Sequence, residues 1–98
     1  MIKIVAKLTV REDEIGAFQG LARELVEKSR AEAGNVSYSL NQSVSDPKEH
    51  AFIEIWKDQA AIDTHNASAH FTTIFPKLAA LTVADSKPVV DLFTEVTW

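Results

Sequence analysis

The chain has 98 residues, of which 46% are hydrophobic and 24% charged, and its formal net charge is -4. This length provides for one hydrophobic core, so we expect a single domain over residues 1–98, and the composition is that of a folded protein. The excess of acidic residues, with no basic run, argues against nucleic acid and membranes as partners. The absence of cysteine excludes disulfides, thiolate nucleophiles, zinc–thiolate sites and iron–sulfur clusters.

Residues 2–10 alternate between apolar and polar side chains, which predicts a β-strand with one buried face. The apolar positions of this strand are Ile2, Ile4, Ala6, Leu8 and Val10. An alternating segment is unlike a signal peptide, and no segment approaches the roughly 20 apolar residues of a membrane span. We therefore expect a cytoplasmic protein.

An amphipathic helix is predicted next, because apolar residues recur at three- and four-residue spacing from Ile15 to Val26, opposite a charged face. Gly34 is expected to end this helix in the left-handed conformation. Residues 36–44 alternate again and predict a second strand. Turn residues at 45–49 lead into a third strand at about residues 50–57, so these two strands should form an antiparallel hairpin.

The third predicted strand is apolar on both faces. Phe52, Glu54 and Trp56 share one face of this strand. Ile53 and Ile55 lie on the other face, together with a neighbouring alanine. Both faces therefore need to be covered by other parts of the protein.

Two further helices and a last strand complete the pattern. A short helix is predicted to begin at residues 57–59 and to stop at about residues 65–66. Ser68 is expected to cap the following helix, which Pro76 should kink or split because proline has no N–H for the carbonyl of Thr72. Residues 87–98 are predicted to form a fourth strand that is also apolar on both faces.

The element order β-α-β-β-α-β is that of a ferredoxin-like α+β sandwich, a four-stranded antiparallel sheet with helices on one face. Helices on one face leave the other apolar face of the third and fourth strands uncovered, and soluble monomers avoid apolar patches of that size. We therefore expect two copies of the chain to pair their open sheet faces in a homodimer. Trp98 should then contact the partner.

Histidines and carboxylates are the main candidates for chemistry in a chain without cysteine. His50 begins a strand and is expected to be solvent-exposed. His65 and His70 are five residues apart, which is not the i,i+4 spacing of a helical metal pair, so no metal site is predicted. A chain break at residues 66–68 could still bring these two rings together. No phosphate-binding loop, dinucleotide fingerprint or nucleophile elbow is present.

The segment EIWKDQAAIDTHNASAHF at residues 54–71 has the pattern Glu-x-Trp-x8-His-x4-His-Phe. Together with the first strand, the Glu-Ala-Gly-Asn-Val-Ser-Tyr-Ser-Leu run at 32–40 and the last strand, this pattern resembles the antibiotic-biosynthesis-monooxygenase (ABM) superfamily. Its greatest likeness is to the quinol-monooxygenase and autoinducer-2-processing branch. The resemblance implies a dimeric α/β barrel with a small-molecule cavity in each subunit. It also implies oxidation of an electron-rich aromatic or quinol by O2, with no cofactor.

The polar residues of two other ABM branches are absent from this chain. In the aromatic-polyketide branch an Asn and a Tyr flank the Trp that corresponds to Trp56, and those two positions hold Phe52 and Ile62. The haem-degrading branch uses an Asn, a Trp and a His in that order along the chain. The equivalent positions here hold Ala6, His65 and Phe75. The activities of these branches, and haem as a cofactor, are therefore not expected.

Oxygenation without a cofactor requires a base, because O2 reacts more readily with an electron-rich anion than with a neutral phenol. We expect His65 to be this catalytic base, since its ordinary pKa near 6.5 suits proton transfer at neutral pH. Glu54 is expected to orient His65 or to share its proton. The expected substrate-binding residues are Trp56, Tyr38, Phe52, His70, Phe71 and Phe75.

Two alternative functions remain open. An isomerase or processing enzyme for a small phosphorylated ketose, such as autoinducer-2, could use the same proton transfer by His65. Few cationic side chains are expected to point inward, which makes a phosphate harder to bind. A dimeric module that binds a metabolite without turnover is the third possibility.

Overall fold

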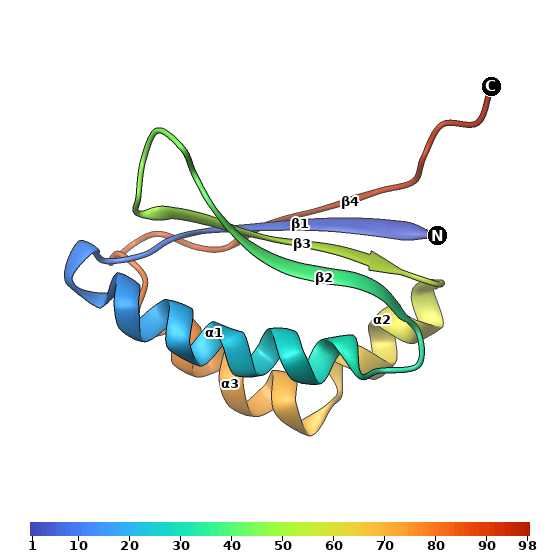
Figure 1. Ribbon diagram of the computed structural model, residues 1–98, viewed down its shortest axis with the longest axis horizontal. Coiled ribbons are helices and arrows are strands. Elements are labelled where there is room, and N and C mark those ends of the chain that lie inside the picture. The colour runs from blue at the N-terminus through green and yellow to red at the C-terminus, as the bar shows by residue number, and fades with distance from the viewer.

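The four strands form one antiparallel sheet, and the helices lie together on one of its faces (Figure 1). The computed structural model describes residues 1–98. In chain order the elements are β1 (Ile2–Thr9), the 3-10 turn η1 (Glu12–Glu14), α1 (Ile15–Arg30), β2 (Asn35–Gln42), β3 (Glu49–Trp56), α2 (Gln59–Asn66), α3 (Ala69–Ala79) and β4 (Val89–Phe93). The strand order β2-β3-β1-β4 confirms the predicted ferredoxin-like α+β architecture, with its second helical segment divided into α2 and α3.

Side chains of the two central strands, β1 and β3, alternate between the two faces of the sheet, and those on the inner face form one side of the core. Ala6 of β1 pairs with Phe52 of β3, and both side chains are buried on the face that carries the helices. Helix α1 packs its predicted apolar stripe against this face. The buried residues of that stripe are Phe18, Ala22, Leu25 and Val26.

Strand β2 departs from the predicted alternation at its first residues. A β-bulge between Asn35 and Ser37 shifts the pairing with β3, so Val36 is half-exposed while Tyr38 is buried. Val44 lies beyond the end of the strand and is fully exposed. The predicted antiparallel hairpin of β2 and β3 is confirmed.

Gly34 does not end helix α1. The helix ends at Arg30, and no glycine of the chain has a positive φ, so the predicted left-handed conformation of Gly34 is wrong. Gly34 is needed for space instead, because a Cβ atom at this position would collide with the Cβ of Ala61 in α2. The Gly34 carbonyl also accepts a hydrogen bond from the N–H of Lys57 (2.9 Å). The α1–β2 loop is thereby held against the start of α2.

Side-chain caps begin both of the short helices. The carboxylate of Asp58 accepts a hydrogen bond from the N–H of Ala61 (2.9 Å) at the start of α2. The hydroxyl of Ser68 accepts one from the N–H of Phe71 (3.2 Å), which confirms Ser68 as the cap of α3.

Pro76 does not split α3, which continues without interruption from Ala69 to Ala79. Proline removes only the hydrogen bond to the carbonyl of Thr72, and the next turn is closed by a bond from the N–H of Ala80 to the carbonyl of Pro76 (3.1 Å). Neither α3 nor the other helices combine the length and the apolar character that a membrane span requires.

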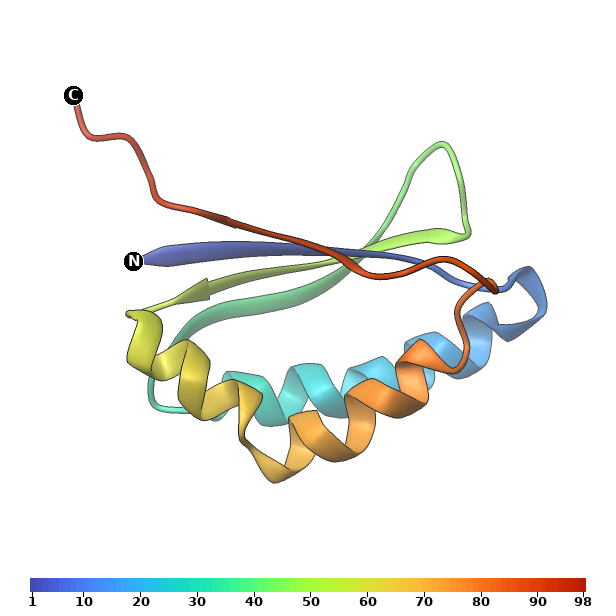
Figure 2. The same cartoon turned by 180° about the vertical axis from the view of Figure 1, so that it is seen from behind.

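Strand β4 forms one edge of the sheet and is the least covered element. It is shorter than the predicted 87–98, and residues 94–98 leave the sheet and project from the body of the molecule (Figures 1 and 2). Every residue of β4 is exposed. No helix covers the outer face of the sheet, where Ile53 is 42% exposed. Apolar surface therefore remains uncovered along β4 and on the outer face.

Replacing Gly34 with Ala should destabilise the fold by about 1–3 kcal/mol, because the new Cβ overlaps Ala61 and forces the α1–β2 loop away from α2. The matched control is Gly20→Ala in α1. A Cβ at Gly20 meets no atom within 4 Å, so this change should stabilise the helix by up to about 1 kcal/mol. Urea unfolding measures both effects. Adding Ala61→Gly should restore most of the stability lost in Gly34→Ala, whereas wild-type stability of Gly34→Ala would contradict the close approach.

Candidate functional site

A cavity of about 530 Å³ lies between the inner face of the sheet and the helices α2 and α3. Residues from all four strands and from both helices line it, and most of them are hydrophobic. No lysine or arginine is among the lining residues. The half-exposed Val90 and Leu92 of β4 belong to the lining, so the cavity reaches the surface along this edge. Its volume is that of a small-molecule binding site.

Six residues proposed from the sequence line this cavity, and two do not. The six are Tyr38, Phe52, Glu54, His65, Phe71 and Phe75. Trp56 is fully buried behind the cavity wall, and His70 contacts Glu32 instead. Both rings nevertheless pack against His65, with centroid distances of 4.6 Å for Trp56 and 5.9 Å for His70.

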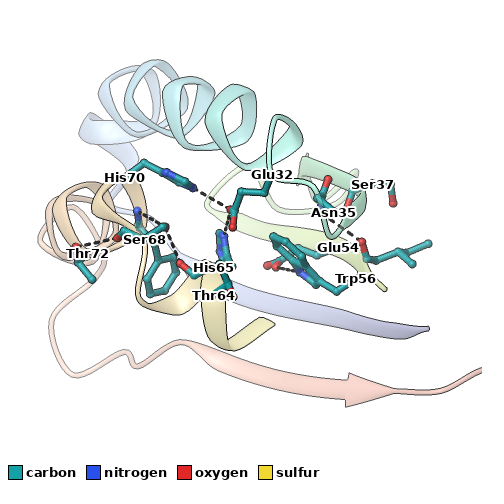
Figure 3. Close-up of polar contacts among 12 residues, drawn as sticks. Glu32, Asn35, Ser37, Glu54, Trp56, Thr64, His65, Ser68, His70 and Thr72 are labelled. Carbon is teal, nitrogen blue, oxygen red and sulfur yellow. Dashed lines mark hydrogen bonds and ion pairs between the residues drawn. The ribbon is translucent and has the colours of Figure 1, made fainter. Parts of the chain in front are cut away.

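Glu32 is not among the site residues predicted from the sequence, although it is the first residue of the run at 32–40 noted above. Its Oε2 atom lies 2.6 Å from His65 Nδ1 and 2.9 Å from His70 Nε2 (Figure 3). A carboxylate oxygen only accepts hydrogen bonds, so both imidazoles donate to it. Glu32 lies in the α1–β2 loop, 33 and 38 positions before the two histidines. Neither strand nor helix periodicity connects residues so far apart.

The break between α2 and α3 brings the two histidines to one carboxylate. His65 lies at the C-terminal end of α2 and His70 in the first turn of α3. Between them the hydroxyl of Ser68 caps α3 and donates a hydrogen bond to the carbonyl of His65 (2.6 Å). On one continuous helix, side chains five residues apart would point in different directions.

His65 is almost completely buried among aromatic rings. Its centroid lies 4.6 Å from Trp56, 5.5 Å from Tyr38 and 4.9 Å from Phe71. Burial lowers the pKa of His65, an effect that Glu32 partly offsets, and this favours the neutral ring. A neutral ring that donates its one proton from Nδ1 to Glu32 leaves Nε2 as an unprotonated acceptor, and this atom is buried without a hydrogen-bond partner.

Glu54 places an acidic group in the wall of the same cavity. Its Oε1 atom accepts a hydrogen bond from the indole N–H of Trp56 (2.8 Å). Burial raises the pKa of Glu54 to about 7, although the hydrogen bond from Trp56 opposes this shift. Glu54 can therefore give or take a proton near neutral pH. Burial also raises the pKa of Tyr38, with a further contribution from Glu54, so the phenol keeps its proton.

His50 does not belong to the site, and the expectation that it is solvent-exposed is wrong. It is only 2% exposed, because its pairing with Leu8 turns it to the inner face of the sheet. The side-chain amide of Gln19 donates to His50 Nε2 (3.1 Å), and His50 Nδ1 donates to the carbonyl of Lys48 (3.2 Å). With both nitrogens bonded, His50 is a structural residue of the core.

The cavity combines a neutral imidazole acceptor, a carboxyl group that titrates near pH 7 and a phenol, all between apolar walls. This set of groups can remove a proton from a bound hydroxyl and stabilise the resulting oxyanion. It provides no cationic side chain for an anionic substrate group. The side chains that converge closely enough to hold a metal ion are those of Glu32, His65 and His70.

The raised pKa of Glu54 makes the stability of the protein depend on pH. The carboxyl titrates near 4.5 when exposed and near 7 in the folded chain, so the folded state binds more protons between these values. The free energy of unfolding should therefore fall as the pH rises from 4.5 to 7. Relative to Glu54→Gln, which keeps an acceptor for Trp56, the wild type should lose up to about 3 kcal/mol over this range. Urea unfolding at several pH values measures the difference, and a constant difference would contradict the raised pKa.

Comparison with known proteins places the chain in a family. Residues 1–77 match the family model for antibiotic biosynthesis monooxygenase, ABM. The chain is 39% identical over 71 residues to a Bacillus subtilis (strain 168) protein named "Putative monooxygenase YcnE", across 72% of this chain and 75% of that protein.

Solved structures agree with this match over the whole fold. One described as an antibiotic biosynthesis monooxygenase has a TM-score of 0.91 and 37% identity, over 99% of this chain and 100% of that one. A conserved protein from Methanosarcina mazei Go1 has a TM-score of 0.92 and 29% identity, over 97% and 92% of the two chains. Glu32, Glu54, His65 and His70 all lie within the residues that match the family model. The chain belongs to the antibiotic biosynthesis monooxygenase family.

Proposed function

We propose that the protein is a cofactor-independent monooxygenase that uses O2 to oxidise a small electron-rich aromatic compound, such as a quinol. The observation that carries this proposal is the buried and unpaired Nε2 of His65, a residue of the wall of an apolar cavity. Burying an acceptor without a partner costs about 1–3 kcal/mol, and a hydroxyl group of a bound substrate would remove this cost. The family match and the monooxygenase name of the B. subtilis relative support the same class of reaction.

The proposed reaction begins with removal of a proton from the substrate. Ground-state O2 accepts electrons one at a time, and a phenolate or enolate donates them more readily than the neutral compound. The protein must therefore take the proton, stabilise the anion and keep water away from the radical pair. His65 Nε2 takes the proton of the substrate hydroxyl, and Glu32 stabilises the imidazolium through its hydrogen bond to Nδ1 (2.6 Å).

Tyr38 interacts with the substrate anion in this proposal, and Glu54 with the oxygen reduced from O2. Tyr38 keeps its proton and can donate a hydrogen bond to the substrate anion. Glu54, with a pKa of about 7, can return a proton to the reduced oxygen. Phe71 and Phe75 stack with an interplanar angle of 17° and provide a flat apolar wall for an aromatic ring.

Trp56 and His70 act through their neighbours in this proposal, not by contact with the substrate. Trp56 donates its hydrogen bond to Glu54, and His70 donates to Glu32. Neither of these two side chains is part of the cavity lining.

The cavity favours a neutral aromatic substrate over a phosphorylated ketose. A phosphate needs positive charge or a set of free backbone N–H groups, and the lining contains no lysine or arginine. Glu54 would repel the phosphate whenever it is ionised. A binding module without turnover would use the same cavity, so oxygen consumption is the property that separates it from an oxygenase.

The protein is proposed to act as a homodimer joined through its outer sheet faces. Large apolar residues are exposed on this side of the molecule. They are Ile53 of β3, the outward-facing Val89 and Phe93 of β4, and Trp98. Burying about 800 Å² per subunit of such surface would supply on the order of 20 kcal/mol before the costs of association. Residues 94–98 project from the molecule and would reach toward the partner (Figure 2).

His65→Asn should lower the rate of O2 consumption by about 10²–10⁴-fold, because it keeps a donor for Glu32 but removes the acceptor Nε2. The assay follows protein-dependent O2 uptake with reduced naphthoquinols and anthrones. The control is Glu27→Gln on the exposed face of α1, which should leave the rate unchanged. No protein-dependent uptake by the folded wild type across this panel would remove the oxygenase proposal.

Ile53→Lys should abolish the dimer, because it places a charge in the middle of the proposed apolar interface. Lys28→Glu, a charge change on the exposed face of α1, should leave the dimer unaffected. Sedimentation analysis at micromolar concentration measures both variants. A folded, monodisperse monomer of the wild-type chain would contradict the proposed interface.

A further inference from the structure

We propose that Glu32, His65 and His70 form a site for one first-row divalent transition-metal ion, such as Zn²⁺, and that an ion bound there blocks the action of His65 as a base. The site itself does not depend on the proposed oxygenation. The inhibitory effect does rest on that proposed function. The two parts of the proposal therefore need separate measurements.

The ligand atoms of these three side chains already converge. Glu32 Oε2 lies 2.6 Å from His65 Nδ1 and 2.9 Å from His70 Nε2, and all three atoms lie within 4.8 Å of one another (Figure 3). Two imidazoles and one carboxylate are a ligand set that suits Zn²⁺ and its neighbours in the first transition row. With metal–ligand bonds of about 2.0–2.1 Å, tetrahedral ligand atoms lie about 3.3 Å apart, so shifts of roughly 1 Å would admit an ion.

The three ligands come from elements that hold them in place. Glu32 lies in the α1–β2 loop, His65 at the end of α2 and His70 at the start of α3. The hydroxyl of Ser68 donates a hydrogen bond to the His65 carbonyl (2.6 Å) and caps α3, so it fixes the break between α2 and α3 that separates the two histidines. An ion would replace the two hydrogen bonds that already hold Glu32 next to His65 and His70. It would therefore not have to bring three flexible side chains together.

Of the three ligands, Glu32 can be approached by an ion from outside the substrate cavity. Glu32 also lines a separate surface hollow of about 390 Å³, together with Lys57, Asp58 and Thr64. The side chains of Glu32 and His70 remain 13% and 18% exposed, whereas that of His65 is only 2% exposed. The hollow could therefore supply water for the open coordination position that three protein ligands leave on Zn²⁺.

Metal binding would reverse the hydrogen-bonding character of His65 at the cavity. In the metal-free protein the ring proton is on Nδ1, where it is donated to Glu32, and Nε2 is an acceptor without a partner. Coordination through Nδ1 requires the lone pair of that atom, so the Nδ1 proton leaves and a proton from water binds Nε2. The ring stays neutral, but Nε2 becomes a donor. It could then no longer take a proton from the hydroxyl of a substrate.

Calorimetric titration of the chelator-treated full chain with Zn²⁺ tests the site without any substrate. We expect saturable binding at a stoichiometry near one ion per chain. Glu32→Gln and His70→Gln should each weaken it by at least about 10-fold, and Glu27→Gln should bind as the wild type does. The partly exposed His70 provides a variant that should fold even where Glu32→Gln does not, as circular dichroism will show. No saturable binding, or undiminished binding in folded His70→Gln, would overturn the site.

Oxygen uptake with and without saturating Zn²⁺ tests the inhibitory effect. We expect the ion to lower the rate of the wild type at least 10-fold and to leave the residual rate of His65→Asn unchanged. An undiminished rate in protein that calorimetry shows to be saturated would overturn the inhibition while the site stands. No uptake in either condition, with normal Zn²⁺ binding, would instead overturn the proposed oxygenation.

Discussion

The carboxylate of Glu32 accepts hydrogen bonds from two histidines, and the arrangement of the site depends on this contact. It joins the α1–β2 loop to the end of α2 and the start of α3. Hydrogen bonds to a charged acceptor contribute about 1.5–3 kcal/mol each when they are shielded from water. The same contact determines which nitrogen of the neutral His65 ring carries the proton, and so which nitrogen is left as an acceptor. A structural contact between a loop and two helix ends is thus also the origin of the hydrogen-bonding character of His65 in the cavity wall.

The cavity keeps polar groups in an environment that does not fully satisfy them. His65 Nε2 has no partner, and Glu54 has only the indole N–H of Trp56 to offset its burial. Both features reduce the stability of the folded chain, and they lie in the wall of one cavity that reaches the surface at β4. Perturbed titratable groups that meet in a cleft are typical of active sites. The cost in stability is consistent with a site that is completed by its substrate.

The periodic parts of the fold could be predicted from the sequence, because an element that is buried on one face has apolar residues at regular spacing. Strands β1 and β3, the apolar stripe of α1 and the cap at Ser68 all follow from such local patterns. Features that depend on tertiary contacts could not be predicted in this way. The requirement for glycine at position 34 is set by the approach of Ala61. The burial of His50, by contrast, follows from strand alternation, because His50 shares the inner face of β3 with Phe52 and Glu54.

The candidate site likewise contains residues that local patterns predict and residues that only tertiary packing brings together. The inward positions of Tyr38, Phe52 and Glu54 follow from strand alternation, and six of the eight proposed residues line one cavity. Glu32 could not be found in this way, because its partners are 33 and 38 residues distant and only the packing of α2 and α3 against the loop brings them together. The absence of a hydrogen-bond partner for His65 Nε2 likewise results from that packing and not from the sequence pattern.

The protonation state of the two His65 nitrogens tests most directly whether Glu32 prepares this side chain as an acceptor. A long-range proton–nitrogen correlation NMR spectrum of the metal-depleted protein, near neutral pH, distinguishes protonated from unprotonated imidazole nitrogens. We predict a proton on Nδ1 and none on Nε2 in the wild type, and a loss of this preference in Glu32→Ala. A wild-type His65 that carries its proton on Nε2 would contradict both the role of Glu32 and the use of His65 as the base.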